Sequence, residues 1–123
     1  MRFVHQHADY IEGADRRNYV AQVYAGELDG GAWQAWCVFF PQKGEGFAAT
    51  GRETTQSTFD AVRYWASSLT HRYFEGALDR ALANDPPAAA DADAYAAAAD
   101  AARDRAREVQ VMKRAMRRGL RFG

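Results

Sequence analysis

Short runs of apolar residues, broken by glycines and polar turns, fill the first half of the chain and predict an antiparallel β-meander. Residues 19–24 (YVAQVY) and 33–40 (WQAWCVFF) are rich in β-branched and aromatic residues, which favour strands. Asp29-Gly30 lies between these two runs and is a strong hairpin signal. Residues 47–54 supply a third strand and residues 1–10 are a candidate fourth. The pattern therefore predicts three or four antiparallel strands.

The strand from Trp33 to Phe40 has two apolar faces. Successive side chains of a strand point to opposite sides of the sheet. One side carries Trp33, Ala35, Cys37 and Phe39, and the other carries Gln34, Trp36, Val38 and Phe40. Since both sets are mostly apolar, both faces of the sheet need cover. One helix can cover only one face, so the other must meet a second helix, the N-terminal segment or another chain.

After the third strand the apolar spacing changes from two residues to three or four. The positions that recur at this spacing are Phe59, Val62, Ala66, Leu69, Tyr73, Ala77 and Ala81. This is the helical period, so one long helix is expected from near Ser57 to Leu82, lying on one face of the sheet. Thr55, Ser57 and Thr58 are candidate N-caps, and Asn84-Asp85-Pro86-Pro87 ends the helix.

A second helix is expected from Ala88, because alanine is the best helix former and dominates the sequence there. A narrow apolar stripe runs along it through Tyr95, Ala98, Ala102, Val109, Met112 and Met116. Such a stripe suits pairing with another helix, and packing against the chain's own domain is equally compatible with it. The organisation expected is an α+β domain over residues 1–83, a linker over 84–87, and a basic helix and tail over 88–123.

The formal net charge of zero hides a separation of charge along the sequence. From Arg103 onward there are eight basic and two acidic residues, a net charge of +6, so the rest of the chain carries −6. Such a division indicates a basic arm that meets nucleic acid, a protein partner or the acidic body of a neighbouring copy. The candidate contacts for DNA, RNA or a partner, with no acidic residue among them, are Lys113, Arg114, Arg117, Arg118 and Arg121. The alternative is a solvated helix face.

Composition places the chain among ordinary soluble globular proteins, with 48% hydrophobic and 26% charged residues. No N-terminal segment resembles a signal peptide and no apolar run is long enough to span a membrane, so a cytoplasmic protein is expected. The single cysteine, Cys37, excludes an intramolecular disulfide. Its apolar surroundings predict a buried side chain rather than a nucleophile.

His5, His7 and Asp9 form a first polar cluster with candidate chemistry. They occupy alternate positions, so on a strand all three would project from one face, as ligands of zinc or a similar ion do. Only one other histidine, His71, is present, and a solvated N-terminal strand is the preferred interpretation. No Ser–His–Asp or Cys–His arrangement stands out, so no metal, no cofactor and no catalytic residue is expected.

Arg52, Glu53, Thr54, Thr55 and Gln56 form a second polar cluster, at the junction of the third strand and the helix. A helix N-terminus favours anions, so these side chains are a candidate site for a phosphate or another polar ligand. The structural alternative, which is preferred, is that they cap the helix and that Arg52 pairs with Glu53 or a neighbour.

The order of elements also resembles one known family. Strands at Tyr19–Tyr24 and Trp36–Pro41 lead through a glycine-containing loop into Gly46-Phe47-Ala48-Ala49-Thr50-Gly51. A helix starts soon after the turn Gly51-Arg52-Glu53-Thr54-Thr55. Over about residues 19–82 this arrangement resembles the HicB-like antitoxin domain. The resemblance implies a degenerate double-stranded-RNA-binding-like fold used for protein interaction, often coupled to DNA binding by a separate C-terminal module.

Taken together, the sequence favours a small, non-enzymatic binding or regulatory module. It is expected to be a homo-oligomer that engages nucleic acid or a protein partner through its basic C-terminal helix. The doubly apolar sheet and the +6 segment are the reasons. The alternatives are a small metal-binding protein or enzyme that uses His5, His7 and Asp9, and a structural assembly subunit.

Overall fold

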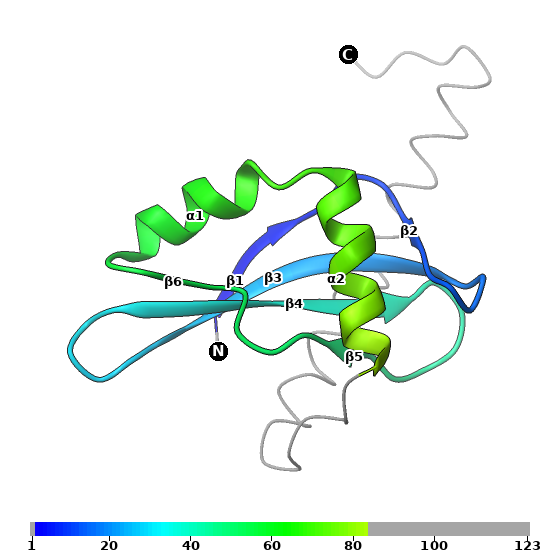
Figure 1. Cartoon of the computed structure of the whole chain (residues 1–123), viewed down its shortest axis with the longest axis horizontal. Helices are drawn as coiled ribbons and strands as arrows, with labels where there is room; N and C mark the ends of the chain where they lie inside the picture. The colour runs from blue at the N-terminus through cyan, green and yellow to red at the C-terminus, as the bar shows by residue number, and fades with distance from the viewer. Residues whose placement is uncertain (1, 84–123) are drawn as a thin grey trace, which may run out of the picture.

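The computed structural model describes residues 2–83; residues 1 and 84–123 lie outside the described part. Within it the chain forms an antiparallel sheet and two helices, which confirms the predicted α+β class. The strands are β1 (Arg2–Gln6), β2 (Ile11–Glu12), β3 (Asn18–Glu27), β4 (Trp33–Pro41), β5 (Ala48–Ala49) and β6 (Thr54–Gln56). The helices are α1 (Phe59–Ser67) and α2 (His71–Ala83), and both pack on the same face of the sheet (Figure 1).

β3 and β4 form a long central hairpin, paired residue by residue along both strands. The turn between them contains Gly30 and Gly31 with φ of +92° and +90°, a left-handed backbone that glycine adopts without steric cost. β1 and β2 pair with the outer side of β3, and β5 and β6 both pair with β4. The two strands and the hairpin signal read from the sequence are therefore confirmed.

The third predicted strand is wrong in one respect, because it consists of two short strands, β5 and β6. Ala49 pairs with Val38. Thr54 pairs with Ala35. The chain therefore advances five residues from Ala49 to Thr54, while the paired strand β4 advances only three, from Val38 to Ala35. The excess residues are held partly by Thr50, whose hydroxyl accepts a hydrogen bond from a backbone N–H of β4 over 2.9 Å. Hydrophobic alternation does not reveal such a local excess, because the residues on either side still have strand character.

The single long helix expected after the sheet is also wrong, because the chain forms two helices with a break at residues 68–70. The hydroxyls of Ser67 and Ser68 donate to backbone carbonyls three residues earlier, and Ser68 is the C-cap of α1. Thr70 then accepts a hydrogen bond from the backbone N–H of Tyr73 over 3.1 Å, as an N-cap of α2 does. The apolar spacing continues across the break, which is why the pattern resembles one helix.

Two apolar clusters lie on opposite faces of the sheet. The first core lies between the sheet and both helices, and its fully buried members include Ala35, Cys37, Phe39, Val62, Phe74 and Leu78. The second-face cluster, on the other side, consists of Val20, Tyr24, Val38 and Phe40. The division of the β4 side chains into two buried sets is thus confirmed.

Several predictions concern residues outside the described part. These are the linker over 84–87, the helix expected from Ala88, and the basic residues Lys113, Arg114, Arg117, Arg118 and Arg121. Within residues 2–83, neither helix has the length and apolar character needed to cross a membrane.

Candidate metal centre

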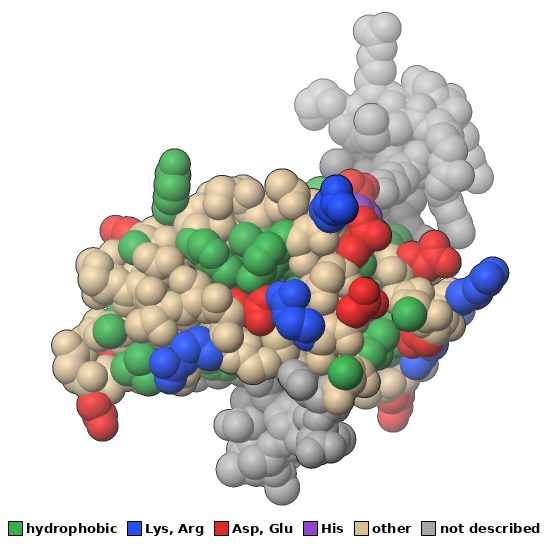
Figure 2. All heavy atoms as spheres, in the orientation of Figure 1, with side chains coloured by type: hydrophobic (Ala, Val, Ile, Leu, Met, Phe, Trp, Pro, Cys, Tyr) green, Lys and Arg blue, Asp and Glu red, His purple; other side chains and the backbone are tan. Residues whose placement is uncertain are grey.

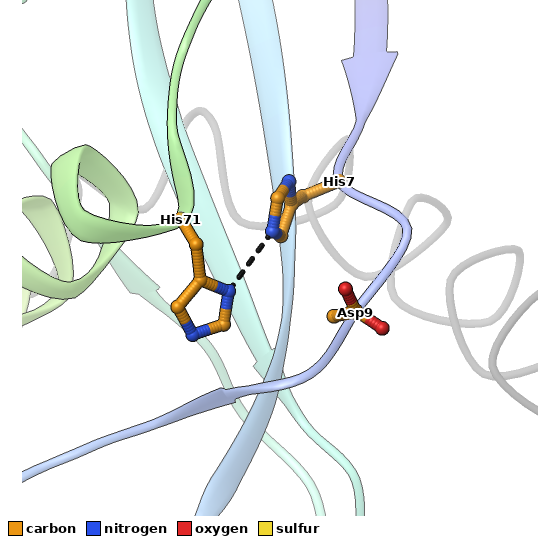
Figure 3. Close-up of side chains that lie close together, drawn as sticks. All are labelled: His7, Asp9 and His71. Carbon is orange, nitrogen blue, oxygen red and sulfur yellow. Dashed lines mark hydrogen bonds between the residues drawn. The ribbon is translucent and has the colours of Figure 1, made fainter.

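Three potential metal ligands meet where the end of β1 approaches the start of α2. They are His7, Asp9 and His71, whose candidate ligand atoms all lie within 4.8 Å of one another. Figure 3 shows the two imidazole rings joined by a hydrogen bond, with Asp9 on the loop that follows His7. His7 and His71 are 64 residues apart in sequence, so the group exists only in the folded chain.

His7 is fixed through both its backbone and its ring. Its backbone N–H donates to the carbonyl oxygen of Ala21 on β3 over 3.0 Å, directly after the end of β1. Its imidazole packs against the buried ring of Phe74 on α2, with 4.9 Å between the ring centroids. The ring is therefore half-buried and held against the helix that carries its partner.

His71 is the first residue of α2 and is directed by contacts at both ring nitrogens. Its Nδ1 lies 3.1 Å from Nε2 of His7. Its Nε2 lies 3.8 Å from Oε1 of Glu75, one turn along the helix. In metal sites the second nitrogen of a ligating histidine commonly faces a carboxylate, which orients the ring and makes it a stronger ligand. Glu75 stands in the position for that role.

Burial favours the neutral form of His7. It lowers the pKa of His7 below the ordinary value of 6.5, the nearby His71 lowers that pKa further, and Asp9 acts in the opposite direction. His7 is therefore neutral at pH 7, and neutral imidazole is the form that binds a metal. In the hydrogen-bonded pair one ring nitrogen donates and the other accepts, so metal binding requires the proton between them to leave.

The spacing of the two nitrogens suits a small transition-metal ion. In a tetrahedral zinc site with Zn–N bonds of about 2.05 Å, two ligating nitrogens lie about 3.3 Å apart. The observed separation is 3.1 Å, close to that value. A carboxylate oxygen of Asp9 lies within 4.8 Å of both of these nitrogens. Two imidazoles and one carboxylate form a donor set typical of zinc, with a further coordination position left open.

The structure groups a different trio from the one that alternation predicts. β1 ends at Gln6 and a bend follows, so His5, His7 and Asp9 do not share one strand face. His5 instead lines an open hollow of about 330 Å³ beside α1, together with Val4, Asp60, Arg63, Tyr64 and Ser67. His71 was missed because no local motif surrounds it; the available hint was Glu75, four residues later on the same predicted helix.

Glu53, from the second polar cluster, faces α2. Its carboxylate accepts a hydrogen bond from the Tyr73 hydroxyl over 2.6 Å and pairs with the guanidinium of Arg80. The Glu53 side chain is only 10% exposed. Burial, followed by the hydrogen bond to Glu53, raises the pKa of Tyr73, so its hydroxyl remains a donor. This arrangement joins α2 to the segment before β6.

The other members of the second polar cluster form separate local contacts. Arg52 donates to Gln34 over 3.2 Å and to Thr55 over 3.5 Å. Gln56 donates to the hydroxyl of Thr54 over 2.9 Å. The preferred interpretation of this cluster as a helix cap is wrong, because β6 forms here and α1 begins later, capped by the Thr58 hydroxyl.

Acidic and basic side chains are interspersed over the face that carries α2 (Figure 2). This distribution suits local ion pairs, such as that of Arg80 with Glu53, better than an extended anion-binding surface on this face.

Cys37 is fully buried in the first core. Burial raises its pKa to about 12, so the thiol is protonated at neutral pH. The prediction of a small buried hydrophobe at this position is confirmed.

The comparisons with known proteins add no relative to this description. Searches with protein-family models, among curated proteins and among solved structures gave no significant match. The resemblance to the HicB-like antitoxin domain accordingly stays a prediction.

Proposed function

We propose that this chain is a metal-binding protein that holds one divalent transition-metal ion, of the zinc type, between His7, His71 and Asp9. The observation that carries the proposal is the 3.1 Å separation of His7 Nε2 and His71 Nδ1. Two imidazoles at that distance become two ligands of one ion when the proton between them leaves. The 3.8 Å approach of Glu75 to the far nitrogen of His71 supports the same assignment.

The proposed ion joins parts of the chain that are distant in sequence. His7 and Asp9 follow β1, whereas His71 begins α2. An ion that binds both therefore stabilises the folded chain over the unfolded one, in which the ligands are far apart. This favours a regulatory or structural use of the metal, in keeping with a non-enzymatic binding module, and the open coordination position is available to water or to a partner's side chain.

The donor set also defines which ions compete for the site. Imidazole nitrogen suits zinc, copper, nickel and cobalt, whereas magnesium and calcium prefer all-oxygen sites. We therefore expect zinc to bind in the presence of a large excess of magnesium.

Titration of the metal-stripped full chain with zinc tests the proposal by calorimetry. One ion should bind per chain, and Co²⁺ in its place should give the visible absorption of a tetrahedral site. His7→Ala and His71→Ala should each weaken binding by at least about 100-fold, more than the 10–100-fold typical for loss of a supporting partner. His5→Ala is the matched control and should leave the affinity unchanged. Wild-type affinity in His71→Ala, or an equal loss in His5→Ala, would contradict the proposed ligand set.

We also propose a second function, that the basic segment binds nucleic acid. The observation that favours it is the net charge of +6 from Arg103 onward. The proposed contacts to phosphates are Lys113, Arg114, Arg117, Arg118 and Arg121. The resemblance to HicB-like domains, where a separate C-terminal module often binds DNA, points in the same direction.

A further inference from the structure

The face of the sheet opposite the helices is apolar and deeply buried. Val38 is 0% exposed, Phe40 1% and Val20 5%. The partly buried apolar residues that pack against this second-face cluster are Tyr10, Trp36, Phe47 and Ala49, which belong to the sheet and its loops. Both described helices lie on the other face (Figure 1). Within residues 2–83 no helix lies on this face, and its described cover is the side chains of the sheet and its loops.

The polar side chain of Gln22 on this face is buried, with its hydrogen bonds made inside the protein. It lies on β3 in line with Val20 and Tyr24, and it is 0% exposed. Its amide donates to Gln6 over 2.9 Å and its carbonyl oxygen accepts from the Tyr24 hydroxyl over 2.6 Å. A buried polar side chain whose hydrogen bonds are made within the sheet needs no solvent, so an apolar layer can close over it.

We propose that residues 88–118 of the same chain form an amphipathic helix whose apolar stripe covers this second face. The stripe contains Tyr95, Ala98, Ala102, Val109, Met112 and Met116. From residue 95 to residue 116 a helix spans about 32 Å at 1.5 Å per residue. The ten residues of β3 extend over about 30 Å at 3.3 Å per residue. The stripe therefore matches the length of the central strand.

The connection from α2 is long enough for this path. α2 ends at Ala83 and packs against the edge strand β5, beside which its C-terminal end lies (Figure 1). Passing around that edge to the opposite layer takes about 20 Å, given a helix diameter of 10–12 Å and about 10 Å between layers. The four linker residues 84–87 span up to about 14 Å when extended. Residues 88–94, as the start of the proposed helix, add about 10 Å at 1.5 Å per residue, so the path is covered.

Docking in this orientation also determines where the basic residues lie. At 100° per residue, the positions on the side of the helix away from Val109 are Arg103, Arg107, Arg114 and Arg118. They follow one another at steps of four, seven and four residues, so they form one row along the outer surface. Arg105 and Lys113 lie about 40° to either side of Val109, so in this orientation they flank the docked stripe and only their long side chains reach the surface. Arg114 and Arg118 are then the outward contacts for phosphates.

The test uses the full chain with Trp36 as the reporter of the second face. Trp33→Phe and Trp65→Phe leave it as the only tryptophan, and iodide quenching then measures its exposure. Val109→Asp, which places a charge in the stripe, should raise the quenching constant several-fold. The matched control Gln110→Asp places the same charge one position away, outside the stripe, and should leave the quenching constant unchanged. Circular dichroism verifies that each variant is folded.

The other possible quenching and light-scattering results also support or overturn the proposed docking of residues 88–118. Equal quenching in Val109→Asp and the control overturns the proposal. A full chain that is dimeric by light scattering, with Trp36 becoming quenchable on dilution, overturns it in favour of a second copy as the cover. If Val109→Asp does not fold, Val109→Ala replaces it: increased quenching supports the proposal, and unchanged quenching overturns it.

Discussion

At the scale of single residues, Glu75 is the side chain expected to strengthen His71 as a ligand. Glu75→Gln removes the negative charge 3.8 Å from His71 Nε2 but keeps the size of the side chain. We expect zinc affinity to fall by about 10–100-fold, the usual effect of losing such a partner. Calorimetric titration of the full chain measures this. Asp79→Asn, an exposed acidic residue one turn further along α2, is the matched control and should retain wild-type affinity. Equal affinities in the two variants would remove Glu75 from the site.

His7 should also make the stability of the metal-free chain depend on pH. Its pKa is lowered in the folded state, chiefly by burial, so below pH 6.5 the unfolded chain binds more protons at this position than the folded chain. The free energy of unfolding should therefore decrease as the pH falls from 6.5 through the lowered pKa. Denaturant titrations between pH 7.5 and 4.5 should show a smaller decrease in the free energy of unfolding for His7→Gln than for the wild type. Some decrease should remain in this variant, because burial lowers the pKa of His5 as well. The same pH dependence in wild type and His7→Gln would show that His7 does not contribute.

At the scale of secondary structure, the break at residues 68–70 is what positions His71. A helix continuing from α1 would run straight through this segment, whereas the new start at Thr70 places His71 in the first turn of α2. Thr70→Ala should lower the free energy of unfolding by about 1 kcal/mol, as loss of an N-cap commonly does. It should also weaken zinc binding, because the first turn of α2 carries a ligand.

Thr58→Ala provides the matched control for this prediction. It removes the N-cap of α1, whose hydroxyl accepts from the backbone N–H of Ala61 over 3.1 Å. We expect a similar loss of stability and no change in zinc affinity, since α1 holds none of the proposed ligands. Urea unfolding and zinc titration of both variants separate the two effects. Equal zinc affinities in Thr70→Ala and Thr58→Ala would show that the cap of α2 does not position the ligand.

The elements recovered from the sequence are those defined by local pattern. β3 and β4 were predictable because β-branched and aromatic residues flank Asp29-Gly30, and the alternation along β4 gave the correct division into two buried faces. The break between α1 and α2 was not predictable from the sequence, because the apolar period is unchanged across it. His71 was missed for a related reason: its meeting with His7 depends on how α2 packs, and no periodicity within one segment encodes that.

At the scale of the whole molecule, the two faces of the sheet serve different proposed purposes. The helix-bearing face holds the candidate metal ligands at the junction of β1 and α2. The opposite face is apolar, and the stripe in residues 95–116 is its proposed cover. A helix docked there presents its arginine row outward, on the side of the sheet away from the proposed metal. Metal binding and nucleic-acid binding are therefore predicted to be independent of each other.

This separation leads to a prediction for the full chain. Arg114→Gln with Arg118→Gln should weaken binding to duplex DNA or RNA and lower the slope of log affinity against log salt by about 2, close to one unit per lost phosphate contact. Arg16→Gln with Arg63→Gln removes the same charge from the described domain and should leave that slope unchanged. Zinc affinity should be equal in both double variants, because none of these residues is a ligand. Fluorescence anisotropy at several salt concentrations measures the slope. A full chain without salt-dependent binding to either nucleic acid would refute this second function and leave the metal proposal standing.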